Sequence, residues 1–291
     1  MHRDRRNRTS ALADLATQDD WQTLYQRLTL EEFPYEARMG WQLAFLRPFA
    51  VPRMAKMLVD GRQLVDRPKK RAYDTGLIIY EIVWGGFDSP RAREMVRLIN
   101  RSHHGFDIEP EDMTYVLCCF IVCPLRHIEL LGWRSLTDSE RESSVQFFGR
   151  LGQLMNIAHI PSTYSEAEQI FDSYEAQNVA ASESSRLLTD NLIRVLKDMQ
   201  PRIARPFAVT TFTLLLNDRR VAAALGLRPP GPTTERVVRR LLRLSGRVKR
   251  ELPPSRKVIF TPGRSGSVMY PHGYELGDLG PPTKVHPPDC S

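Results

Sequence analysis

Apolar residues recur at helical spacing along most of this chain, and no alternating strand pattern rivals them. A spacing of three and four residues between apolar positions is typical of a helix that buries one face. The pattern predicts helices over residues 11 to 28, 41 to 60, 69 to 84, 90 to 104, 111 to 131, 138 to 156, 166 to 178, 183 to 199, 206 to 224 and 234 to 250.

Three helix starts carry recognisable capping residues. Ser89 followed by Pro90 supplies an N-cap and a proline at the first helical position. Thr137-Asp-Ser-Glu140 and Ser165-Glu-Ala-Glu168 both match the capping box, in which a hydroxyl and a carboxylate satisfy each other's free backbone donors. These signals predict helices that begin near residues 90, 138 and 166.

The chain shows no internal repeat and no glycine-rich linker in its middle, which favours one domain. The predicted organisation is a basic tail over 1 to 10, a single multi-helix globular domain over 11 to 251, and an irregular arm over 252 to 291. The arm is rich in proline and glycine, so a regular helix cannot continue there. The expected fold class is all-α.

Charge leaves a second class of function open. The net charge of +7 is concentrated in two arginine-rich segments, residues 3 to 8 and 236 to 250. A solvated helix face explains such segments. The alternative is a helical binding protein that uses residues 236 to 250 on nucleic acid or an acidic partner, although that segment lacks aromatic stacking residues.

The chain shows no secretory signal and no obvious membrane span. Its amino terminus is arginine-rich without an apolar region, and the apolar stretch from Met113 to Leu125 is shorter than a bilayer requires. Cys118, Cys119 and Cys123 lie in that stretch without paired zinc-site spacing, so we expect reduced, buried thiols. These features predict a cytoplasmic protein without a transmembrane span.

Two small groups of residues carry candidate chemistry. Arg71 and Thr75 stand four residues apart on a predicted helix, so both point to one face and together suit a carboxylate or phosphate. His103 and His104 end the next helix, where an imidazole either caps the helix or binds a metal. Adjacent helical residues point about 100° apart, so at most one histidine faces a given interior site. No nucleotide-binding loop, zinc-protease motif or hydrolase elbow competes.

The order of several motifs resembles the MpaB and rubber-oxygenase catalytic-domain family. The resemblance rests on "RPKKRAYDT", "RLINRSHHGFDIEPEDMTYVL" and "CPLRHIELLGWRSLTDSERE", followed by "IPSTYSEAEQIFDSYE", "ALGLRPP" and "MYPHGYELGDLG". It covers roughly residues 30 to 280 and is strongest between 67 and 142.

The resemblance implies an all-α domain that encloses haem b and activates dioxygen. Matched by position, an arginine and a threonine near the haem fall on Arg71 and Thr75. The axial ligand falls on His103 when the family's N-x-x-H pattern is matched through Asn100, and closer to His104 when spacing is counted from Thr75; we prefer His103.

The chain departs from rubber oxygenases at one position. They carry a lysine directly before the threonine, where this chain has Asp74. The resemblance is therefore closer to the MpaB-like branch. It implies oxidation or oxidative cleavage of a small lipophilic substrate, such as a terpenoid or another secondary metabolite, without nucleic acid as a favoured partner.

Overall fold

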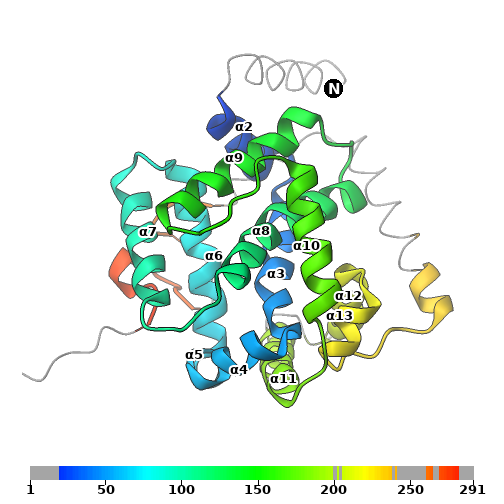
Figure 1. The fold of residues 1–291 in the computed structure, drawn as a ribbon. Coiled ribbons are helices and arrows are strands. Elements are labelled where there is room, and N and C mark those ends of the chain that lie inside the picture. Colours follow the sequence, from blue (N-terminus) through cyan, green and yellow to red (C-terminus); the bar gives the residue numbers. More distant parts are fainter. Residues whose placement is uncertain are drawn as a thin grey trace, which may run out of the picture.

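The computed structural model describes residues 20–198, 202, 205–237, 240, 260–264 and 269–281, and these residues form a bundle of helices (Figure 1). The α-helices are α2 (Trp21–Arg27), α3 (Pro34–Leu46), α4 (Pro52–Asp60), α5 (Gln63–Asp66), α6 (Pro68–Gly85), α7 (Pro90–His103), α8 (Pro110–Leu131), α9 (Asp138–Leu154), α10 (Tyr164–Asn178), α11 (Glu183–Asp198), α12 (Arg205–Leu216) and α13 (Arg219–Ala224). Three short elements complete them, the π-helix η1 (Leu28–Glu32) and the 3₁₀ helices η2 (Arg47–Ala50) and η3 (Leu276–Asp278). Within this described part the chain has no strand, only an isolated bridge between Thr261 and Arg264, so the all-α expectation is confirmed.

Helix α8 is the centre of the bundle, and α3, α9 and α10 pack around it (Figure 1). Helix α3 approaches closely because Gly40 has no side chain: a Cβ there would lie 2.2 Å from the Cα of Pro124. Cys118, Cys119 and Cys123 are buried in α8 as free thiols, as expected. Burial raises the pKa of the Cys118 thiol to about 12, so these cysteines serve packing rather than chemistry.

Two of the three expected helix starts are correct. Ser89 caps α7 by accepting from the backbone of Ala92, and Thr137 forms the capping box with Glu140. Helix α10, however, begins two residues earlier than expected. Its cap is Thr163, which accepts from the backbone of Glu166, so the expected Ser165 box is wrong.

Two helices expected to be continuous are interrupted. The segment 41 to 60 breaks at η2, because Pro48 and Pro52 cannot donate the backbone hydrogen bonds of a continuous helix. The segment 206 to 224 breaks at Asn217, which has a φ of 51°, and Asp218 then caps α13. Apolar spacing continues across both breaks, so periodicity alone missed them. Residues 11 to 19, 199, 238, 239 and 241 to 250 of the expected helices lie outside the described residues.

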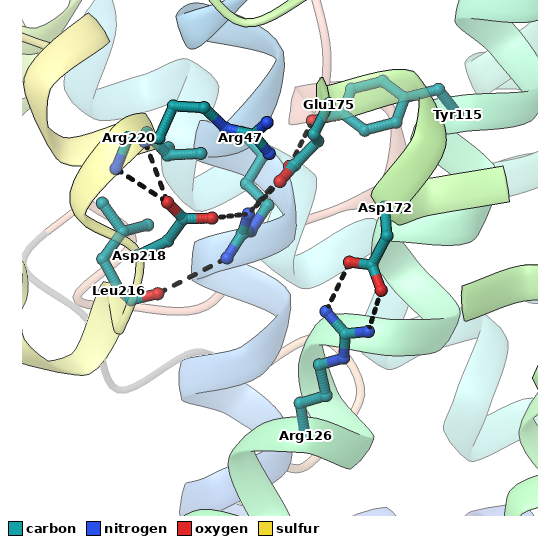
Figure 2. Close-up of polar contacts among 9 residues, drawn as sticks. Arg47, Tyr115, Arg126, Asp172, Glu175, Leu216, Asp218 and Arg220 are labelled. Carbon is teal, nitrogen blue, oxygen red and sulfur yellow. Dashed lines mark hydrogen bonds and ion pairs between the residues drawn. The ribbon is translucent and has the colours of Figure 1, made fainter. Parts of the chain in front are cut away.

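A buried ion pair ties the outer helices to the core (Figure 2). Arg47 donates from Nη1 to both carboxylate oxygens of Glu175 at 2.7 Å, and Tyr115 donates to Glu175 at 2.8 Å. Arg47 also reaches the carbonyl of Leu216, at 3.4 Å, and Asp218, at 3.6 Å. Because an unpaired buried charge is costly, this network specifies how α10 and α12 dock on α8.

The described residues near the carboxyl terminus, orange to red in Figure 1, pack on α6 and α7. Phe260 stacks on Tyr80 of α6 with ring centroids 5.0 Å apart. A Cβ on Gly280 would lie 2.8 Å from Leu98 of α7, so glycine permits this close approach. The two helices that carry the candidate site residues are therefore covered by a distant part of the chain.

Candidate functional site

Arg71 and Thr75 lie together on the first turns of α6. Pro68 occupies the first helical position, and Arg71 follows one turn later. The Arg71 guanidinium donates to the Thr75 hydroxyl, which itself donates to the Arg71 carbonyl at 2.8 Å. The guanidinium carbon lies 5.8 Å from the ring centroid of Phe45 on α3. The pair therefore shares one face, as its spacing predicts.

The charge of Arg71 is poorly compensated. Burial lowers the pKa of Arg71, and the negative charge of Asp74 opposes that shift only in part. Among the described residues no carboxylate lies within ion-pair distance of the Arg71 guanidinium, in contrast to Arg47 with Glu175. A guanidinium in this situation is available to bind an anionic group.

His103 is held in a defined orientation at the end of α7. Its Nδ1 lies 2.8 Å from the carbonyl of Ile99. A carbonyl only accepts, so Nδ1 carries the proton and Nε2 keeps its lone pair. Burial lowers the pKa of His103; the hydrogen bond to Ile99 opposes this shift, and the nearby charge of Arg71 adds to it. The ring is therefore a neutral imidazole with one nitrogen free to bind a metal.

Packing of α6 against α7 brings Arg71 and His103 near each other, although 32 positions separate them in the sequence. His104 differs from its neighbour. It is the C-cap of α7, its side chain is exposed, and Gly105 follows with a φ of 90°. Of the two adjacent histidines, His103 is part-buried and lies near Arg71, whereas His104 is exposed.

Phe45 and Gly76 were not singled out from the sequence, and Asp74 was noted only for its difference from rubber oxygenases. Phe45 lies under Arg71, as described above. Asp74 is buried at 1% exposure, which its position just after a run of basic residues did not suggest. Gly76 stands in the interior of α6, yet a Cβ there would meet no atom within 4 Å. Glycine costs about 0.5 to 1 kcal/mol relative to alanine inside a helix. The packing of neighbouring side chains therefore does not explain the glycine at this position, which leaves open space beside Thr75.

The described residues contain no group of three or more histidine, cysteine, aspartate or glutamate side chains placed to hold a metal ion. His103 is instead a single imidazole close to one cation. Such an arrangement suits a metal whose other ligands come from a cofactor.

The chain belongs to the family described as "ER-bound oxygenase mpaB/B'/Rubber oxygenase, catalytic domain", whose sequence profile matches residues 37–247. That match includes α6, α7 and all four candidate residues. The resemblance found in the motifs is therefore confirmed.

Two curated relatives come from Penicillium brevicompactum. ER-bound oxygenase mpaB' is 29% identical over 244 residues, which cover 77% of this chain and 57% of the relative. ER-bound oxygenase mpaB is 27% identical over 220 residues, covering 69% and 56%. This chain therefore matches little more than half the length of each relative.

These relatives correct the expected location. Both are named ER-bound, so the expectation of a cytoplasmic protein is wrong. It rested on the lack of an amino-terminal signal, but proteins also bind membranes through other segments or surfaces. The apolar stretch is also longer than expected: α8 has 22 residues, and by length and composition it is the one described helix able to cross a membrane. However, 67% of its most apolar stretch is buried within the fold, and a core helix meets the same criteria of length and composition.

Proposed function

We propose that this protein is a haem b-dependent oxygenase that oxidises or oxidatively cleaves a small lipophilic substrate with dioxygen. The observation that carries the proposal is the neutral, oriented imidazole of His103 near the poorly compensated guanidinium of Arg71. Family membership supports the reaction class, because the family and both relatives are named oxygenases.

The residues present fit haem b. His103 would bind the haem iron through Nε2, because its Nδ1 is held by the Ile99 carbonyl. Arg71 would bind a haem propionate, because haem carries carboxylates and this guanidinium has none in contact. Thr75 would orient the guanidinium or add a hydroxyl to the same site. His104, exposed at the helix end, is the alternative ligand and the less suitable one.

When bound, haem would supply the activation of dioxygen. The protein contributes the rest. Ile99 fixes the proton on Nδ1 of His103, so the ring presents a lone pair to the metal. Phe45 lies against Arg71 and limits water around the charge, which strengthens its attraction for an anion.

The substrate class follows the MpaB-like branch rather than polyisoprene. Rubber oxygenases have a lysine where this chain has Asp74, and here that carboxylate is buried in contacts within the protein. We also propose that the protein acts at a membrane surface, as the names of its relatives suggest. Sedimentation of expressed protein with membranes, before and after a carbonate wash, tests that part separately.

The visible spectrum of the purified protein tests the haem proposal directly. We expect a Soret band and a pyridine haemochrome of haem b in the wild type. His103→Ala should lose stable haem, whereas His104→Ala should keep it because its side chain points to solvent. A colourless wild type that refuses haemin would overturn the haem proposal. Loss of haem only in the His104 variant would move the ligand by one residue.

A further inference from the structure

A buried carboxylate on α6 holds a segment from the far end of the chain. Asp74 accepts from the hydroxyl of Tyr270 at 2.7 Å and from the backbone N–H of Gly280 at 2.9 Å. Lys70, one turn before it on α6, donates to Asp74 at 2.5 Å and to the carbonyl of Asp278 at 2.6 Å. Both carboxylate oxygens of Asp74 are therefore committed to contacts within the protein.

A second buried acid repeats this arrangement two turns further along α6. Glu81 is also 1% exposed and accepts from the hydroxyl of Tyr274 at 2.6 Å. Arg91 of α7 donates to the same carboxylate at 2.6 and 2.8 Å. Asp74 and Glu81 are seven residues apart and so lie on one face of α6. Tyr270 and Tyr274 therefore bind the same face of this helix, two turns apart.

The contacts of Tyr270 with Asp74 and of Tyr274 with Glu81 differ in their distance from the candidate site. Asp74 lies between Arg71 and Thr75 in the sequence, within one turn of both. Glu81 lies six residues beyond Thr75, about 9 Å along the helix axis at the usual rise per residue. Only the contact of Tyr270 with Asp74 therefore holds the turn that carries Arg71 and Thr75.

We propose that Asp74 is a positioning residue of the oxygenase site, and that Tyr270 and Gly280 hold Arg71 and Thr75 in place through it. We name the described residues 269–281 the C-terminal clasp. The inference rests on the proposed function for the identity of the cofactor, but the positioning of α6 does not depend on it.

The surroundings of Arg71 explain why the turn of α6 that carries it needs contacts from outside the helix. Arg71 lies in a poorly solvated place without a carboxylate in contact, so its charge favours leaving that place for water. Asp74 opposes this tendency in two ways. Its contacts with the clasp fix the backbone of the turn, and its charge favours the charged form of Arg71.

The clasp also reaches the second helix of the site. Gly280 lies against Leu98 of α7, five residues before His103, and η3 packs on α7. A single segment thus contacts the helix of the arginine and the helix of the histidine. Loosening it should change the relative placement of Arg71 and His103, which neither helix fixes alone.

A matched pair of variants separates positioning from general stability. Tyr270→Phe and Tyr274→Phe each remove one hydroxyl that donates to a buried carboxylate on α6, and each keeps its ring. The measurements are the rate of haem loss from the holoprotein to excess apomyoglobin, the thermal midpoint, and amide hydrogen exchange over residues 71–75. Asp74→Asn is a third variant, which removes the charge and keeps the shape.

Tyr270→Phe and Asp74→Asn should each speed haem loss by at least about fivefold, because each weakens a hydrogen bond to the charged group that holds the Arg71 turn. Amide exchange over 71–75 should rise in both. Tyr274→Phe should lower the thermal midpoint about as much as Tyr270→Phe does. Its rate of haem loss and its amide exchange over residues 71–75 should stay near wild type.

Equal effects of the two tyrosine variants on haem loss, or unchanged exchange over 71–75 in Tyr270→Phe, would overturn the positioning role. Failure of the proposed function is distinguishable, because a wild type without haem shows it before any variant is made. Hydrogen exchange would then still decide whether the clasp holds the Arg71 turn.

Discussion

Replacing Arg71 with methionine should weaken cofactor binding without a matching loss of stability. Methionine keeps much of the length of the side chain and removes its charge. In most proteins a buried arginine is paired, and removing it destabilises the fold because its partner is left behind. Arg71 has no carboxylate in contact, so its removal leaves no buried anion.

The magnitudes follow from the contacts. The variant loses a hydrogen bond to Thr75, about 1 kcal/mol, and a contact with the Phe45 ring, about 0.5 to 1 kcal/mol. It also gains the relief of a desolvated charge, so the haem-free protein should stay within about 1 kcal/mol of wild type. A lost charge-assisted bond to a propionate, about 1.5 to 3 kcal/mol, corresponds to haem affinity weaker by about 10- to 150-fold.

Two assays read these quantities separately. Urea unfolding of haem-free protein gives the stability, and titration with haemin followed at the Soret band gives the affinity. Arg91→Met is the matched control, since Arg91 pairs with the buried Glu81. That variant should lose about 2 to 5 kcal/mol of stability, because Glu81 stays buried with less compensation.

Equal destabilisation of the haem-free protein by Arg71→Met and Arg91→Met would refute the absence of a carboxylate partner for Arg71. An unchanged haemin affinity in Arg71→Met would instead show that the guanidinium has no part in the cofactor site. The two results are independent, so the electrostatic description and the proposed role can fail separately.

Three further predictions use other contacts. Thr75→Val keeps the shape and removes the hydroxyl, so turnover should fall while the haem content measured by pyridine haemochrome stays near wild type. Burial lowers the pKa of His103 in the folded protein, so His103 of the unfolded chain is protonated first as pH falls. The wild type should therefore lose stability, relative to His103→Gln, as pH drops below about 6.5. Urea unfolding at a series of pH values measures this loss. Glu175→Gln leaves Arg47 without its buried partner charge and should cost about 3 to 5 kcal/mol, measured by urea unfolding, and a smaller loss than Tyr115→Phe causes would contradict the network in Figure 2.

The sequence determined the local features of this protein. Apolar spacing gave the helical class, and the proline and hydroxyl signals placed the starts of α7 and α9. The relation of Arg71 to Thr75 was also fixed, because residues four apart share a face in any helix. These features depend on neighbours within one or two turns, so the chain carries them without reference to its fold.

The tertiary structure decided what no local pattern contains. The approach of Arg71 to His103 depends on how α6 packs on α7, and the fold leaves His103 part-buried but His104 exposed. The partners of Asp74 lie about two hundred positions away, so its sequence context showed only a charged residue among others. Burial and long-range pairing set the charge state and orientation of these groups, and both exist only once the helices have packed.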